Sequence, residues 1–439
     1  MKNLVLLLAS LFFYGWGEPK YLVFMFASVT QSYIAALLVE RFRGTRIAKL
    51  ALAVSAVASL GLLAYCKYAD FFIGNFNAVT GLSIPHLKVA LPVGISFYTF
   101  QILSYVIDVY RGDVPAQRNF VDLAMYVAMF PQLIAGPIVR YSDIAGSLKN
   151  RKTTLADASE GITRFSVGLA KKILLANSAA LLVSEFKAYG EKTVLFYWLY
   201  AAAYMLHIYF DFSGYSDMAI GLGRIFGFRF CENFNYPYIS ASITEFWRRW
   251  HISLGSWFRD YLYIPLGGNR VKPIRHIFNI LVVWAATGFW HGASWNFVLW
   301  GLFYAILLLF EKYILHPKRR LAVFMHIYTM LFVVLGFVLF DSASIADAFM
   351  SFKSLFGLAG IPTANTASLY YLKSNLVLLS VAAVGATPLP KRIYEKIGET
   401  AGGSRVLAVL TPAATVASIA VCTAYLIDGS FNPFVYFRF

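Results

Sequence analysis

The segment GFWHGASWNFVLWG, residues 288–301, places His291 among tryptophans, glycines and aliphatic side chains. Burial disfavours the charged form of a histidine ring, and the neutral ring keeps one nitrogen that can accept a proton. His291 is therefore a candidate general base. Trp290 precedes it, and Ser294 and Trp295, three and four residues further on, can face the same cavity. A histidine that serves only packing is the alternative.

A second histidine lies in ITEFWRRWHISLGSWFRDYLYIPLGGNR, residues 243–270. Aromatic residues recur there at helical spacing with arginines between them, a pattern typical of an amphipathic helix at the membrane interface or dipping into the protein. Interfacial anchoring explains Trp250 and Arg248 well. It explains His251 less well, because helical spacing puts this residue beside Trp247 on an aromatic-rich side. We therefore predict a functional role for His251.

A third cluster of polar residues is HIYFDFSGYSDMAIG, residues 207–221. His207 and Asp211 stand four residues apart, which puts their side chains on one helical face, and Tyr215 follows one turn later. The two interpretations are a polar pair that anchors helix packing and a pair that lines a polar cavity. The histidines could also converge with Asp211 on a metal ion, but no close-spaced ligand motif supports this, so we predict no metal site.

The composition indicates which elements must position these residues. Of the 439 residues, 59% are hydrophobic and 14% are charged, against roughly 25% charged in soluble domains. We therefore predict a polytopic membrane protein. The net charge of +16 indicates basic cytoplasmic loops rather than nucleic-acid binding. Three widely spaced cysteines suggest neither disulfides nor a thiolate metal site.

Apolar stretches recur along the whole chain, separated by short polar or basic connectors. They cover residues 3–16, 21–40, 50–66, 88–106, 120–138, 161–184, 194–222, 276–290, 293–315, 321–340, 369–387 and 404–427. A crossing needs about 20 apolar residues, so the shorter stretches must be tilted, half-crossing or packed inside protein. We expect about ten or eleven crossings, with some re-entrant pieces, in a single membrane domain over residues 1–439.

Orientation follows from the basic loops. The densest are residues 40–49 and 316–320, and both should be cytoplasmic. The first apolar segment has no basic region before it and no small-residue cleavage site after it. It is predicted to be a membrane helix rather than a cleaved signal peptide.

Five longer motifs stand in order along the chain. FWRRWHISLGSWFRDYLYIPLGG (246–268) is followed by TGFWHGASWNFVLWG (287–301). The others are LPVGISFYTFQILSYVIDVYRG (91–112), FPQLIAGPIVRY (130–141) and YFDFSGYSDMAIGLG (209–223). Together they resemble the bacterial membrane-bound O-acyltransferases (MBOAT), in particular the group that O-acetylates alginate, cellulose and peptidoglycan. Members of this group commonly begin with one more apolar helix, so this chain is expected either to lack a crossing or to have a misassigned start.

The resemblance implies a ring of tilted helices around a thin centre, with a tunnel from a cytoplasmic donor side to an outer acceptor side. It implies that residues 243–301 form the catalytic core, that His291 is catalytic and that His251 occupies the partner position. The residues that we expect to line the tunnel are Trp290, Trp295, Asn296, Trp247, Arg248, Asp211 and Tyr215.

The expected reaction is acyl transfer. His291 would take the proton of an acceptor hydroxyl as it attacks a thioester-linked acyl group, expected to come from acetyl-coenzyme A as a substrate rather than a bound cofactor. Donors to the developing oxyanion would be His251, tryptophan N–H groups or backbone N–H groups. The expected partners are a polysaccharide acceptor and an extracytoplasmic esterase-like acetyltransferase.

The chain ends in DGSFNPFVYFRF, residues 428–439, which has two interpretations. Alternating aromatics with Arg438 fit an aromatic belt that ends the last helix. The motif also resembles the C-terminus of the small protein that accompanies the teichoic acid D-alanyl transferase, and this likeness implies Tyr436 as a first acyl acceptor.

Two other function classes stay open. A transporter or export-complex subunit would use His207 and Asp211 as a proton relay. An assembly scaffold would dock a partner through the tryptophan-rich helix.

Overall fold

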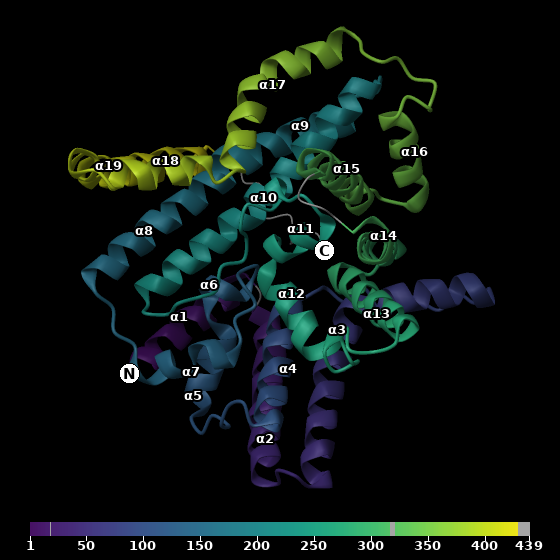
Figure 1. The fold of residues 1–439 in the computed structure, drawn as a ribbon. Helices are drawn as coiled ribbons and strands as arrows, with labels where there is room; N and C mark the ends of the chain where they lie inside the picture. The colour runs from purple at the N-terminus through teal and green to yellow at the C-terminus, as the bar shows by residue number, and fades with distance from the viewer. Residues whose placement is uncertain (18, 317–320, 429–439) are drawn as a thin grey trace. The chain divides into compact units, whose positions relative to one another are not determined.

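The computed structural model describes residues 1–17, 19–316 and 321–428. Every regular element in these ranges is helical (Figure 1). Seven helical segments in the described chain are long and apolar enough to cross a membrane: Pro19–Arg41, Arg46–Thr80, Leu155–Ala188, Trp295–Leu315, Ala322–Asp341, Thr366–Gly385 and Ala401–Ile427. The predicted all-α polytopic architecture is confirmed.

The chain divides into two compact units, and the prediction of one domain over residues 1–439 remains untested. Unit 1 comprises Met1–Gly161 with Leu222–Cys231, and unit 2 comprises Ile162–Gly221 with Glu232–Phe439. Each of the candidate site residues that the structure describes belongs to unit 2.

Unit 1 is built from helices of very different length. They are α1 (Lys2–Gly17), α2 (Leu22–Arg41), α3 (Arg46–Thr80), α4 (Ile95–Arg111), α5 (Phe120–Ala128), α6 (Phe130–Leu133) and α7 (Tyr141–Asn150). Helices α2, α3 and α4 pack against one another, and α1 packs on α5. Helix α3 continues well past the predicted stretch 50–66 because its end is set by Gly81, which takes the left-handed conformation of a C-cap at φ 73°.

In two predicted apolar stretches of unit 1, the helix begins or ends at a residue with a special backbone conformation rather than where the hydropathy changes. The stretch 88–106 becomes helical only at Ile95, after Gly94 in the left-handed conformation. A β-carbon at Gly94 would lie 2.5 Å from the carbonyl oxygen of Leu133, so only glycine fits there. The stretch 120–138 is interrupted after Ala128, and the four-residue α6 follows with a proline in its first turn.

The remaining helices lie in unit 2, apart from one end of each of two helices. A continuous helix runs through α8 (Leu155–Ala170), the π-helical turn η2 (Lys171–Ala176) and α9 (Asn177–Ala188). The next elements are α10 (Val194–Ile225), η3 (Pro237–Ile239), α11 (Ile243–Arg249), α12 (Ile252–Phe258), η4 (Arg259–Tyr263), α13 (Pro273–His291) and α14 (Trp295–Phe310). The last are η5 (Glu311–Leu315), α15 (Ala322–Asp341), α16 (Ile345–Leu355), α17 (Thr366–Gly385), α18 (Leu389–Gly398) and α19 (Ala401–Ile427). The first turns of α8, up to Gly161, and the last turn of α10, from Leu222, belong to unit 1.

The core of unit 2 is aromatic. Its most deeply buried side chains include Phe246, Trp300, Tyr304 and Phe337, contributed by α11, α14 and α15. Rings of this size bury a large apolar area and pack edge to face, which fixes the helices that carry them. The short helix α11 is thereby held inside the unit.

Candidate functional site

The predicted amphipathic helix is broken in two at His251. Helix α11 ends at Arg249, and α12 begins at Ile252. His251 takes the left-handed conformation with φ 45° and ψ 54°, which costs a non-glycine residue about 1–3 kcal/mol. The continuous helix was therefore a wrong prediction.

The break is held open by a strand-like segment from elsewhere in the chain. The backbone N–H of Asn235 donates to the carbonyl of Arg249 at 2.9 Å, and that of Ile252 donates to the carbonyl of Asn233 at 3.0 Å. These bonds satisfy backbone groups on both sides of His251 that a continuous helix would have paired internally. The segment around residue 234 thus fixes the backbone conformation at His251, between the end of α11 and the start of α12.

The start of α11 is fixed by a buried carboxylate. Glu311, from η5, accepts the backbone N–H groups of Ile243 at 2.5 Å and Thr244 at 2.9 Å. The side chain of Ser242 caps the same end by accepting the N–H of Glu245 at 3.0 Å. A negative charge and a side-chain cap both stabilise a helix N-terminus, so α11 has a defined position next to α14.

His251 is anchored by a buried amide that the sequence interpretation missed. Its side chain is 2% exposed, and its Nδ1 lies 3.1 Å from the Oδ1 of the completely buried Asn233. The same oxygen accepts the backbone N–H and the hydroxyl of Ser253, at 3.1 and 2.9 Å. The only signal in the sequence was an uncharged amide among the aromatics of FCENFNYPY.

His291 ends α13 and is enclosed by rings. It is 6% exposed, and its ring centroid lies 5.1 Å from that of Trp290, 5.0 Å from Trp300 and 5.3 Å from Phe340. The indole of Trp290 also contacts His251, at 6.2 Å between centroids. The structure therefore brings together the two histidines that the sequence singled out, with Trp290 beside both. We call His251, His291, Trp290, Trp300 and Asn233 the histidine site.

The electrostatics keep His251 neutral. It lies between two seven-residue helices, neither of which crosses the membrane, and burial lowers the pKa of its ring well below the usual range. The neighbouring charge of His291, when present, lowers the pKa of His251 further.

The indole N–H of Trp300 points to another capacity of the site. This nitrogen is buried, and it has no hydrogen-bond partner among the described residues. A buried N–H without an acceptor is costly, so such a group in a native structure needs an explanation, and a catalytic role is one of them. Because Trp300 contacts His291, its N–H is a candidate donor to charge that develops beside that histidine.

The glycines around His291 serve helix packing. A β-carbon on Gly288 would lie 2.1 Å from the carbonyl oxygen of Phe297, and one on Gly292 would lie 2.2 Å from its ring. A β-carbon on Gly301 would lie 2.1 Å from the carbonyl of Trp284. Helices α13 and α14 therefore cross in direct contact, and this close approach explains the glycines.

The other predicted tunnel residues of the core segment differ in their surroundings. Asn296 is buried, and its amide donates to the carbonyl of Ser342 at 2.7 Å. Trp247 is half-buried and stacks edge to face near Trp300, at 5.5 Å between centroids. Arg248 is exposed, and Trp295 is 54% exposed. The role of these residues as a tunnel lining remains a prediction.

Asp211 and His207 form a separate polar region. Asp211 makes a buried ion pair with Lys172 of η2. The Nδ1 of His207 lies 3.0 Å from the carbonyl oxygen of Ala176. We call Lys172, His207 and Asp211 the ion-pair region. These contacts favour the packing interpretation over the cavity, and Lys172 could have been found as a lysine inside the apolar stretch 161–184.

Two expectations are not decided here. Tyr215 is half-buried on α10, and its place in a tunnel remains a prediction. Tyr436 lies outside the described residues. Within the described ranges, no group of three or more histidine, cysteine, aspartate or glutamate side chains is arranged to hold a metal ion.

Comparisons with known proteins give one consistent result. The family model described as MBOAT, membrane-bound O-acyltransferase family, matches residues 115–346. The chain is 39% identical to a probable alginate O-acetylase of Azotobacter vinelandii, over 100% of this chain and 95% of the relative. It is 36% identical to the peptidoglycan O-acetyltransferase of Helicobacter pylori (82% and 74%) and 29% identical to the teichoic acid D-alanyltransferase of Bacillus subtilis (58% and 70%).

Proposed function

Because this chain belongs to the membrane-bound O-acyltransferase family and is a multi-pass membrane O-acyltransferase, we propose that it moves an acetyl group across the membrane. The donor is a cytoplasmic thioester, acetyl-coenzyme A, and the product is an O-acetylated polysaccharide outside the cytoplasm. The observation that carries this proposal is the convergence of His251 and His291 in one buried site. The names of the alginate and peptidoglycan relatives support the choice of acetyl group and polymer.

In the proposed reaction, neutral His291 accepts the proton of an acceptor hydroxyl. The hydroxyl oxygen attacks the thioester carbonyl carbon and forms a tetrahedral intermediate with a negatively charged oxygen. The carbon–sulfur bond then breaks, the charged oxygen reverts to a carbonyl, and the thiolate takes the proton from His291 and leaves as free coenzyme A. Proton transfer by a positioned base of this kind accelerates reactions about 10²–10⁴-fold.

The developing oxyanion needs a hydrogen-bond donor, and Trp300 supplies the best supported one. Its indole N–H is buried, lacks an acceptor among the described residues and belongs to a ring in contact with His291. A preorganised N–H in a dry site stabilises a transition-state charge without having to reorient. Buried aromatic walls around His291 also exclude water that would hydrolyse the thioester.

We propose Tyr436 as the first acceptor of the acetyl group. The tyrosine hydroxyl would carry the acetyl as an ester to an extracytoplasmic esterase-like transferase, which would pass it to the polysaccharide. Mass spectrometry of the C-terminal peptide, from cells that lack this downstream transferase, should then detect acetyl-tyrosine. Its absence under those trapping conditions, while coenzyme A is still released, would remove Tyr436 from the pathway and leave the membrane acyltransferase step in place.

The experiment that tests the function uses the purified chain in proteoliposomes with radiolabelled acetyl-coenzyme A. We expect release of free thiol and covalent capture of label by the protein. The matched control is His291→Gln, which keeps a polar ring-sized side chain but cannot act as a base. Equal thiol release by both proteins would overturn the proposal.

A transporter with a proton relay at His207 and Asp211 has weaker support. The relay would need a carboxylate that exchanges protons, whereas Asp211 is paired with Lys172 inside the protein.

A further inference from the structure

The amide of Asn233 has a defined orientation. Its oxygen faces the backbone N–H of Ser253 at 3.1 Å, and a backbone N–H can only donate. The side-chain atom of Asn233 that lies next to the N–H of Ser253 must therefore be the acceptor Oδ1 and not the amide nitrogen. His251 Nδ1 lies 3.1 Å from this same oxygen, so Nδ1 must carry the hydrogen and donate it.

This assignment fixes the tautomer of His251. In a neutral imidazole with its hydrogen on Nδ1, the lone pair is on Nε2, so this nitrogen accepts and cannot donate. The ring is also held sterically, because Phe212 packs edge to face against it at 4.6 Å between centroids and an angle of 81°. His251 is thus presented as an acceptor in a fixed orientation, which does not suit the role of oxyanion donor.

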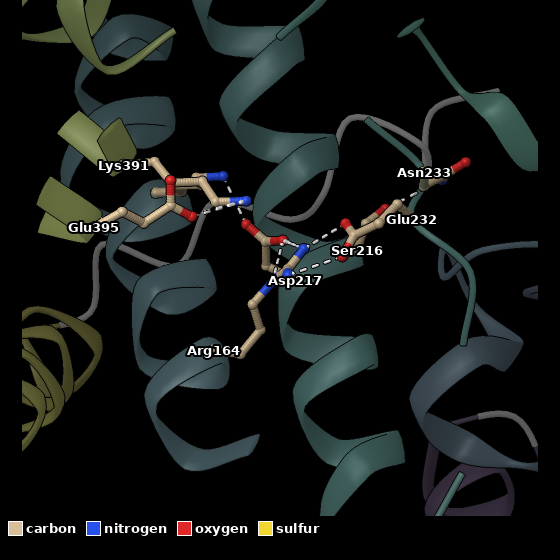
Figure 2. Close-up of polar contacts among 8 residues, drawn as sticks. Arg164, Ser216, Asp217, Glu232, Asn233, Lys391 and Glu395 are labelled. Atoms are coloured by element: carbon tan, nitrogen blue, oxygen red, sulfur yellow. Dashed lines mark hydrogen bonds and ion pairs between the residues drawn. The ribbon is translucent and has the colours of Figure 1, made fainter. Parts of the chain in front are cut away.

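Asn233 and the preceding residue, Glu232, are each tied to α10, as Figure 2 shows. Its amide nitrogen donates to the hydroxyl of Ser216 at 3.2 Å. The preceding residue, Glu232, accepts two bonds from Arg164 at 3.0 and 2.6 Å, and Arg164 also donates to Asp217 at 2.7 Å. Two consecutive residues of the connecting segment are therefore tied to two consecutive residues of α10. Bidentate guanidinium contacts give such a tie a specific geometry.

We infer that Asn233 is a positioning residue for acyl transfer: it holds His251 as the Nδ1–H tautomer, so that Nε2 acts as a hydrogen-bond acceptor in the histidine site. This inference rests on the proposed function for its consequence in catalysis. Its structural part, the tautomer, stands independently of it. In the reaction, Nε2 of His251 would accept a hydrogen bond from the substrate hydroxyl or from protonated His291 and so orient that group. It would not stabilise the oxyanion.

Three variants test the inference. Asn233→Leu keeps the size of the side chain and removes both hydrogen-bonding atoms. Asn233→Asp keeps the acceptor oxygen for His251 and Ser253, and the hydroxyl of Ser216 can turn to donate to the second oxygen. Asn279→Leu is the matched control, because Asn279 is an equally buried amide whose bonds go to the carbonyls of Leu266 and Gly268.

The first measurement is the ¹⁵N spectrum of histidine-labelled protein, in which the signals of His251 are assigned by their loss in His251→Gln. We expect a protonated Nδ1 and an unprotonated Nε2 in the wild-type protein and in Asn233→Asp. We expect this preference to be lost in Asn233→Leu and retained in Asn279→Leu. A wild-type spectrum with the hydrogen on Nε2 would overturn the inference whether or not the protein transfers acyl groups.

The second measurement is steady-state thiol release from acetyl-coenzyme A, with the downstream transferase and its polysaccharide present to take up the acetyl group. A misplaced group near the reacting atoms costs on the order of 10²-fold, so Asn233→Leu should lose about that factor in kcat with KM for the donor unchanged. Asn233→Asp should recover most of it, and Asn279→Leu should lose thermal stability without this loss of kcat. Wild-type kcat in a folded Asn233→Leu protein would refute the positioning role, while equal activity of His291→Gln and wild type would instead refute the proposed function.

Discussion

Two regions of unit 2 bury ionisable side chains, and they neutralise them in different ways. In the ion-pair region, Asp211 and Lys172 carry opposite charges and compensate one another. In the histidine site, His251 is kept neutral by burial and is bonded through one ring nitrogen to an uncharged amide. A compensated charge pair stabilises one arrangement of helices, whereas a neutral ring with a defined acceptor nitrogen can accept a hydrogen bond from a reacting group.

The helix crossings beside the two regions, by contrast, are alike. Helices α8 and α10 meet at Gly168 and Gly214, where a β-carbon on either would lie 2.5 or 2.7 Å from the carbonyl of the other. Helices α13 and α14 meet as closely at Gly288 and Gly301. Close packing alone therefore does not separate a structural region from a reactive one, and the chemistry of the buried groups must decide.

The largest expected effect comes from exchanging one histidine in each region for glutamine. His291→Gln should lower acyl transfer by about 10²–10⁴-fold, because it removes the base. His207→Gln should leave transfer within about twofold, since its amide can still donate to the carbonyl of Ala176. Thiol release from acetyl-coenzyme A measures both, and a comparable loss in the two variants would erase the distinction between the regions.

The next effect concerns the donor to the oxyanion. Trp300→Phe removes the indole N–H but keeps an aromatic ring against His291, and removal of one such donor costs about 10²–10³-fold in kcat. Trp198→Phe is a suitable control, since the indole of Trp198 donates to the backbone carbonyl of Leu355 at 2.9 Å. If the two variants show the same kcat, Trp300 is a packing residue.

The ion-pair region should respond in stability and not in rate. Lys172→Met removes the cation that compensates Asp211, and breaking a buried pair in this way costs about 3–5 kcal/mol of unfolding free energy. The double variant Lys172→Met with Asp211→Leu should recover most of this loss. Unfolding in detergent measures the stability, and turnover per folded molecule should stay near wild type. A selective loss of turnover in the stable double variant would indicate a catalytic role for the pair.

The smallest expected effect is that of adding a methyl group at each of the two helix crossings. Gly301→Ala and Gly214→Ala both force a β-carbon onto a backbone oxygen, at 2.1 and 2.7 Å, and overpacking of this kind costs about 1–3 kcal/mol of unfolding free energy. Gly301→Ala should also lower kcat, because it displaces α13, which carries His291. Gly214→Ala should change the melting temperature alone. Equal kcat values in the two variants would show that the position of α13 tolerates displacement.

Much of the fold followed from local composition. Long apolar stretches predicted most of the spanning helices, because a chain in lipid must satisfy its backbone internally. The boundaries were less well predicted. The ends at Gly81 and Gly94 depend on left-handed backbone conformations, and a hydropathy pattern does not register them.

What the sequence by itself determined was the membrane class, the five motifs and the prominence of His251 and His291, since these depend on residue type and order. Tertiary structure decided the break at His251, because the hydrogen bonds that hold it come from Asn233, 18 residues away. It also decided the character of Asp211, whose cation lies 39 residues earlier in the chain. Helical spacing describes neighbours on one helix, but a buried polar group is satisfied by whichever element packs against it.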